Sequence, residues 1–140
     1  MKVLGESPGY FVGVRLDSEE DLLEALRKIA LEIGVDSGFL FGIGGLKKAV
    51  LGYFVGDKYV SRSFEEQLEV TALIGNISLL EGEIFVHAHL TLGRRDYSTI
   101  SGHALPGCIV HPTMEVVIFS TKPYSFKLKR RRVGAFAPLD

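Results

Sequence analysis

Three of the four histidines of this chain lie in one stretch, His87 and His89 on either side of an alanine and His103 in a Ser-Gly-His sequence. Neutral imidazoles are common metal ligands, and three of them form an incomplete tetrahedral site with one position left for water or a bound molecule. Zinc suits three nitrogen ligands, although iron, nickel and copper accept the same ligand type. The sequence therefore predicts a three-histidine metal site with zinc as the first candidate, but it names no substrate.

The residues around the histidine pair predict a β-strand over 84–92. Successive side chains of a strand point to opposite faces, so the alternate apolar residues face the core while His87 and His89 project together from the other face. The strand rise separates their Cα atoms by about 6–7 Å, which suits two ligands of one metal. The alternative is that these are ordinary surface or hydrogen-bonding histidines of a sheet.

His103 follows a polar loop, residues 93–97, within a segment that can return beside the strand it left. A third imidazole arriving from such a return would complete the ligand set. Glu115 begins a later strand and is expected either to point toward the histidines, as a hydrogen-bond acceptor or a proton-transfer group, or to lie exposed at the strand end. His111 is expected in a loop or behind a ligand rather than as a fourth ligand.

The elements that must position these residues are one helix and a series of strands. Ser18 and Asp21 have capping-box spacing and predict a helix that starts at Ser18, which Gly34 ends. An apolar stripe at helical period indicates that this helix packs on a sheet: Leu22, Leu23, Leu26, Ile29, Ala30 and Ile33. Turn signals between the strands favour a largely antiparallel sheet, with an interruption expected at Gly75-Asn76. The expected strands are 11–16, 39–43, 49–55, 59–64, 68–79, 84–92, 114–120 and 124–129.

Composition limits the class of protein. A length of 140 residues favours a single domain over 1–140. Hydrophobic residues make up 46% of the chain, which favours some apolar surface in a subunit interface. The net charge of −1 argues against a protein that binds nucleic acid over its whole surface. The single cysteine, Cys108, excludes an intramolecular disulfide. With no apolar run of membrane-spanning length and no secretory signal, we expect a cytoplasmic protein with no membrane partner.

Positive charge is concentrated near the C-terminus, in Lys127, Lys129, Arg130, Arg131 and Arg132, with Tyr124 and Phe126 between or before them. This segment is expected either to contact DNA phosphates or to be a solvated edge strand whose cations prevent aggregation. Nothing in it spells the Arg-Gly-Arg-Pro core of an AT-hook.

An ordered set of short motifs resembles the PPC (plant and prokaryote conserved) domain from about Phe11 to the C-terminus. The motifs are Leu68-Glu69-Val70, Gly75-Asn76-Ile77-Ser78, Val86-His87-Ala88-His89-Leu90, Gly102-His103-Ala104-Leu105 and Glu115-Val116-Val117-Ile118. The resemblance implies an α+β fold, a twisted mainly antiparallel β-sheet with one main helix packed on it, assembled as a homotrimer. It also implies that His87, His89 and His103 are metal ligands. Ser101 stands where the family pattern has a glycine.

Two functional hypotheses follow from this resemblance and from the residues. The family is associated with DNA-binding proteins, which in plants carry AT-hooks, so the first hypothesis is a DNA-associated or assembly module with a three-histidine metal site. The fold is also similar to that of acetolactate decarboxylase, where three histidines hold a catalytic zinc. The second hypothesis is therefore a zinc-dependent small-molecule enzyme, decarboxylase-like or hydrolase-like, in which Glu115 or a loop residue moves protons. A purely structural metal is the third possibility.

Overall fold

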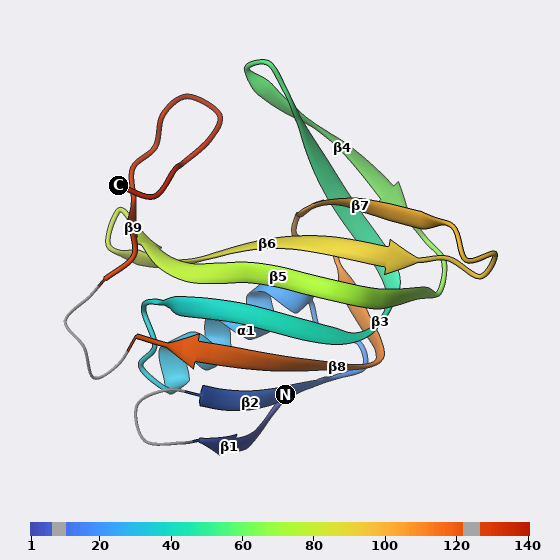
Figure 1. Cartoon of the computed structure of the whole chain (residues 1–140), viewed down its shortest axis with the longest axis horizontal. Helices are drawn as coiled ribbons and strands as arrows, with labels where there is room; N and C mark the ends of the chain where they lie inside the picture. Colours follow the sequence, from blue (N-terminus) through green and yellow to red (C-terminus); the bar gives the residue numbers. More distant parts are fainter. Residues whose placement is uncertain (7–10, 122–126) are drawn as a thin grey trace.

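The computed structural model describes residues 1–6, 11–121 and 127–140, and within these ranges the chain forms one helix and nine strands of a single sheet (Figure 1). The α+β class and the antiparallel character expected from the sequence are confirmed, the exception being a short parallel pairing of β5 with β9. In chain order the elements are β1 (Lys2–Glu6), β2 (Phe11–Asp17), α1 (Leu22–Glu32), β3 (Gly38–Val55), β4 (Lys58–Phe64), β5 (Leu68–Leu80), β6 (Glu83–Gly93), β7 (Thr99–Ala104), β8 (Ile109–Ser120) and β9 (Lys129–Arg130).

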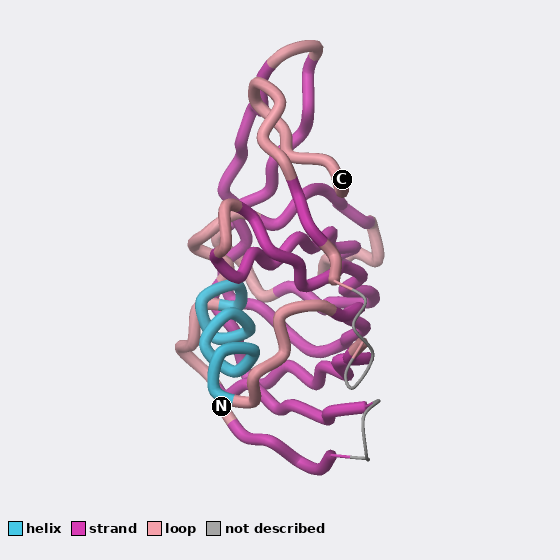
Figure 2. The backbone as a smooth tube through the Cα atoms, turned by 90° about the vertical axis from the view of Figure 1, so that its left-hand side faces the viewer, coloured by secondary structure: helices cyan, strands magenta, loops and turns pink. Residues whose placement is uncertain are grey.

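Helix α1 covers only one face of the twisted sheet, as the side view shows (Figure 2). The predicted apolar stripe faces the core: Leu22, Ala25, Leu26, Ile29 and Ala30 are buried. They join alternate residues of β2, β6 and β8 in one hydrophobic cluster. Burial of such side chains is the main force that holds the helix on the sheet. The opposite face carries no helix within the described part of the chain.

The start of α1 differs from the capping-box prediction. The helix begins at Leu22 with Asp21 as its N-cap, because one carboxylate oxygen of Asp21 accepts hydrogen bonds from the backbone N–H groups of Leu23 and Glu24. The chain before Asp21 stays non-helical because it bonds to β8: the N–H of Glu19 donates to Val110 O, and the N–H of Val110 donates to Glu20 O. The predicted end is confirmed, since Gly34 has the left-handed φ of 64° typical of a residue just past a helix.

Strands β3 and β8 are longer than the sequence suggested, and β5 is continuous; β8 begins at Ile109 rather than at residue 114. The segments expected as separate strands at 39–43 and 49–55 form the single strand β3, which bends at a bulge beside Gly44. Gly44 has a φ of 149°, and a Cβ there would lie 2.3 Å from Thr113 O, so only glycine fits this crossing. β5 runs without the interruption expected at Gly75-Asn76, because both residues keep their pairing with β6. Of the strand expected at 124–129, residues 124–126 lie outside the described residues.

The long β3 allows four strands to close on themselves. β3 pairs with β5, β5 with β6, β6 with β7, and the far end of β3 with β7. β7 is thereby fixed between β6 and β3, which determines where His103 lies. The only helix in residues 1–6, 11–121 and 127–140 is too short to cross a lipid bilayer.

Candidate metal centre

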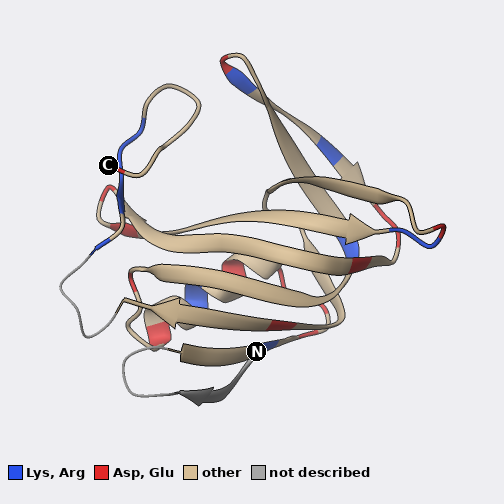
Figure 3. Cartoon of the chain, viewed as in Figure 1, with Lys and Arg blue, Asp and Glu red and all other residues tan. Residues whose placement is uncertain are grey.

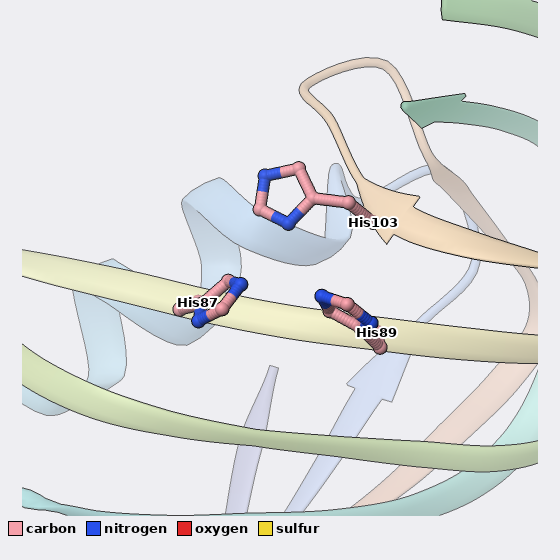
Figure 4. Close-up of side chains that lie close together, drawn as sticks. All are labelled: His87, His89 and His103. Atoms are coloured by element: carbon pink, nitrogen blue, oxygen red, sulfur yellow. The ribbon is translucent and has the colours of Figure 1, made fainter. Parts of the chain in front are cut away.

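The histidines come from two neighbouring strands and project from the same face of the sheet (Figure 4). In β6, Val86, Ala88 and Leu90 are buried, so His87 and His89 emerge together on the other face, as the alternation predicted. His103 lies in β7 and pairs directly with His89 across the two strands. Directly opposed residues of an antiparallel pair share a face, so the third imidazole joins the first two.

The three imidazoles form a compact triangle. Their ring centroids are 5.1 Å apart for His87 and His89, 4.9 Å for His87 and His103, and 5.5 Å for His89 and His103. One ring nitrogen of each lies within 4.8 Å of one ring nitrogen of the others. In a tetrahedral zinc site with Zn–N bonds of 2.0–2.1 Å, the nitrogens are about 3.4 Å apart. Small side-chain rotations would therefore bring one nitrogen of each ring within bonding distance of a single zinc ion.

Burial keeps two of these rings neutral. Desolvation, followed by the positive charge of Arg130 and the neighbouring imidazoles, lowers the pKa of His87 to about 4. The pKa of His103 is also lowered, again first by desolvation and then by His89 and Arg130. A metal binds only the unprotonated nitrogen of an imidazole, so a ring that is neutral at pH 7 is ready to act as a ligand.

His103 has a further property that fits a metal ligand. Its Nδ1 is buried, and no hydrogen-bond partner for it exists among the described residues. A buried polar atom without a partner costs roughly 1–3 kcal/mol, so such atoms are rare in stable proteins unless a water, an ion or a ligand satisfies them. The donor set, its protonation state and this unsatisfied nitrogen all fit a transition metal such as zinc.

Hollows adjoin the histidine triangle on two sides. One, of about 510 Å³, is lined by His89, His103, Tyr59 and Tyr53 among others. The second, of about 250 Å³, lies between the histidines and the C-terminal segment and is lined by His87, His103, Arg130 and Phe136 among others. A metal at the triangle would have three protein ligands and space beside it for a small molecule, the arrangement of catalytic rather than structural zinc sites.

Comparison with known proteins assigns the chain to a family. Residues 5–122 match the Plants and Prokaryotes Conserved (PCC) domain, the family written PPC above. The chain belongs to this family. The resemblance drawn from the histidine motifs is thereby confirmed, and the match includes all three histidines.

Several solved structures share the PCC fold over nearly their whole length. A plant- and prokaryote-conserved protein from Pyrococcus horikoshii is 29% identical, with a TM-score of 0.86 and coverage of 100% of this chain and 97% of that one. A metal-containing protein from Archaeoglobus fulgidus is 28% identical, with a TM-score of 0.79 and coverage of 93% and 91%. A candidate DNA-binding protein from Bacteroides thetaiotaomicron is 29% identical, with a TM-score of 0.87 and coverage of 96% and 94%.

The PCC domain is also similar to part of a larger protein. The bifunctional protein GlmU of two Synechococcus strains is 32% identical to this chain over 114 residues. The match covers 81% of this chain but only 17% of GlmU. This chain therefore spans only a small part of the length of those relatives.

Other residues that the sequence singled out lie away from the PCC histidines. Glu115 pairs with Ile43 of β3, and β5 lies between β3 and the histidine strand, so Glu115 is three strand spacings, roughly 14 Å, from His89. Within one chain it cannot hydrogen-bond to a ligand ring. His111 is exposed and its Nδ1 lies 2.9 Å from Ser18 Oγ, so it does not belong to the triangle.

The sequence did not single out Arg130 within the C-terminal cations. In the PCC structure this residue belongs to β9, and its Nη2 donates a hydrogen bond of 3.0 Å to Nδ1 of His87. Nothing in the local sequence distinguishes Arg130 from Arg131 and Arg132, because the parallel pairing of β9 with β5 that places it is a long-range contact.

Proposed function

We propose that this PCC domain is a metal centre in which His87, His89 and His103 hold a zinc ion and present it to a small molecule. The observation that carries the proposal is the buried, unpartnered Nδ1 of His103 within a triangle of imidazoles, two of them with lowered pKa values. The likeness to a metal-containing protein of Archaeoglobus fulgidus supports it independently.

The chain itself supplies binding and orientation. The β6–β7 pairing fixes two of the three imidazoles opposite one another, and Tyr59 packs against His103 with ring centroids 5.2 Å apart. A zinc ion, when bound, supplies a Lewis acid that polarises a carbonyl group or lowers the pKa of a water molecule, which suits a hydrolase-like or decarboxylase-like reaction. Glu115 of the same chain is too distant to move protons at the histidines. Proton transfer in the enzyme hypothesis would therefore need a different group.

Metal analysis of the purified protein tests the proposal. We expect one zinc or cobalt ion per chain after loading and dialysis, with a cobalt absorption spectrum typical of tetrahedral nitrogen coordination. Each of His87→Ala, His89→Ala and His103→Ala should lower the metal affinity by more than the roughly 10–100-fold that loss of an outer partner of a ligand costs.

His111→Ala is the matched control, because it removes the fourth histidine without touching the triangle. It should bind metal as the unchanged protein does. Metal-free protein after loading, or an equal loss of metal in His111→Ala, would contradict the proposal. Thermal unfolding of every variant separates loss of a ligand from loss of the fold. Zinc removal that leaves the fold and assembly intact would also distinguish this centre from a structural metal site.

A second function that we propose is association with DNA, which is favoured by the likeness to the Bacteroides protein and by the exposed cations Lys129 and Arg131. The other three cations of the basic segment are engaged within the chain: Lys127 with Asp36 at 2.6 Å, Arg130 with His87, and Arg132 with Glu81 at 3.9 Å. Figure 3 shows Lys and Arg spread among Asp and Glu. The basic segment of a single chain therefore offers few phosphate contacts, and a homotrimer, which we propose, would multiply them.

DNA titrations at several salt concentrations test this second function. Binding through phosphates would weaken steeply with salt, with a slope of about −0.9 in log K per contacted phosphate. Replacing both Lys129 and Arg131 with Gln should make that slope shallower by about 2 for each subunit in contact. No binding at low salt, or a slope unchanged by the double substitution, would exclude DNA association through this segment.

A further inference from the structure

Arg130 is a partly buried cation that is held by neutral groups alone. Its Nε donates to Ser78 Oγ at 2.8 Å and its Nη2 to Asn76 Oδ1 at 2.8 Å, while its Nη1 donates to Ala137 O. No ion pair of the described residues includes Arg130. Charged groups are normally buried only with a partner of opposite charge.

The surroundings of Arg130 also fail to compensate its positive charge. The hollow of about 250 Å³ that it shares with His87 and His103 has no acidic residue among the described residues that line it. The second cation of the hollow, Arg132, reaches Glu81 only at 3.9 Å, and both of those side chains are largely exposed. The guanidinium lies over the Phe85 ring, 5.6 Å from its centroid, and the aromatic ring compensates only part of the charge. A metal ion at the triangle would add further positive charge.

The contact between Arg130 and His87 also indicates what a metal would change. A guanidinium only donates hydrogen bonds, so Nδ1 of His87 is the acceptor and the hydrogen of the neutral ring lies on Nε2. Nε2 is the nitrogen that Arg130 leaves available to a metal. A ring that binds metal through Nε2 carries its hydrogen on Nδ1, where it would face the N–H of Arg130. That N–H of Arg130 would then need a different acceptor.

We propose that Arg130, together with the histidine centre, forms a binding site for a small organic carboxylate. The carboxylate supplies both the missing negative charge and the acceptor that Nη2 needs, and a guanidinium is the side chain best matched to its geometry. The remaining walls are largely apolar, with Leu80, Phe85 and Phe136, and this suits the short carbon chain of an organic acid better than inorganic phosphate. The inference deepens the metal-centre proposal and rests on it for the substrate class.

Binding of propionate measured by protein NMR, in the metal-free and the zinc-loaded protein, tests the inference. We expect saturable shifts at residues of the hollow, and binding of propionamide, the neutral analogue of the same shape, about tenfold or more weaker. Arg130→Met keeps an apolar stem but removes the charge and should weaken propionate binding about tenfold or more. Arg131→Met, which removes the neighbouring exposed guanidinium, should leave it within about twofold.

The outcomes separate this inference from the metal proposal. Zinc binding without saturable propionate binding would overturn the carboxylate site and leave the metal centre standing. Propionate binding that depends on Arg130 in a protein that takes up no metal would support the carboxylate site and contradict the metal centre. Inorganic phosphate binding more tightly than propionate would overturn the assignment to carboxylates. Should Arg130→Met fail to fold, Arg130→Lys keeps the charge but loses the planar guanidinium, and equal propionate affinity in that variant would also overturn the inference.

Discussion

Gly75 lies in β5, beside the histidine strand β6, at a position that tolerates no side chain. It pairs with Ala88 of β6, between the two histidines, and a Cβ at residue 75 would lie 2.2 Å from His87 O and 2.9 Å from Ala88 Cα. Both contacts are with backbone, which cannot rotate away. β5 and β6 can therefore pack this closely beside the histidines only because residue 75 has no Cβ atom.

Gly75→Ala should lower the free energy of unfolding by about 1–3 kcal/mol, because β5 and β6 must separate to admit the methyl group. The separation moves the backbone of His87, so zinc affinity should fall as well. Chemical denaturation and zinc titration measure the two effects.

Gly93→Ala is the control for this prediction. Gly93 lies in the same strand β6, and a Cβ there would meet Thr71 Cγ2 at an ordinary 3.5 Å. This variant should be as stable as the unchanged protein or slightly more so, with unchanged zinc affinity. Equal losses in the two variants would show that the close approach at Gly75 is not what constrains the site.

At the level of the element, Asp21 connects the start of α1 to the loop that precedes β8. One of its carboxylate oxygens accepts from the N–H groups of Leu23 and Glu24, and the other accepts from the N–H of Gly107 at 2.7 Å. The same side chain therefore caps the helix and fixes a segment far away in the sequence. Ser18, the residue that the capping-box pattern favoured as the first of the helix, bonds to the exposed His111 instead.

Asp21→Ala should destabilise the protein by about 1–2 kcal/mol, since it removes the cap and the bond to Gly107 together. Ser18→Ala should change stability by less than about 0.5 kcal/mol, the usual range for exposed positions. Urea denaturation of both variants measures the difference. If Ser18→Ala were the more harmful substitution, Asp21 would not be the cap that stabilises the helix.

The sequence predicted those parts of the site that depend on local geometry. Alternation along one strand is enough to place His87 and His89 on a common face, and the polar loop after Gly93 is enough to bring His103 back beside them. Sequence could not give the lateral order of strands, which separates Glu115 from the histidines by three strand spacings. Nor could it identify Arg130, whose place depends on the pairing of β9 with β5.

The same distinction between local geometry and long-range contacts holds for α1 and β3. The end of α1 at Gly34 depends on a local turn and was predicted, whereas its start depends on pairing with β8 and was not. The sequence predicted that the strand over 39–43 ends before Gly44 and Gly45. In the structure these two glycines let β3 pass close to the residues around Thr113, a long-range contact that no local pattern records.

At the scale of the whole molecule, the sheet face without a helix exposes a group of apolar side chains to solvent. Six of its side chains are apolar and exposed, with exposed fractions from 41% to 59%: Phe11, Phe39, Phe41, Ile43, Ile74 and Val117. They are neighbours across β2, β8, β3 and β5, because Phe41 pairs with both Val117 and Ile74. A contiguous apolar surface of this kind is typical of a subunit interface. The homotrimer that we propose would bury it.

The proposed interface reaches the metal centre. Ile74 pairs directly with His89 across β5 and β6, so a subunit that covers Ile74 would end next to the histidine triangle. Assembly would therefore place a second subunit beside the histidine triangle. The oligomeric state should be measured together with metal content for this reason.

Phe41→Lys should convert the proposed trimer into folded monomers, because it places a charge, which is costly to bury in an interface, within the apolar face. Phe41 is 53% exposed in the single chain, so the monomer should keep its fold, which circular dichroism checks. Light scattering coupled to size exclusion should give about one third of the original mass. Leu31→Lys is the control: Leu31 is similarly exposed, at 51%, but belongs to α1 on the other face, and this variant should remain trimeric. A trimer that survives Phe41→Lys, or an unchanged protein that is monomeric throughout, would exclude this face as the interface.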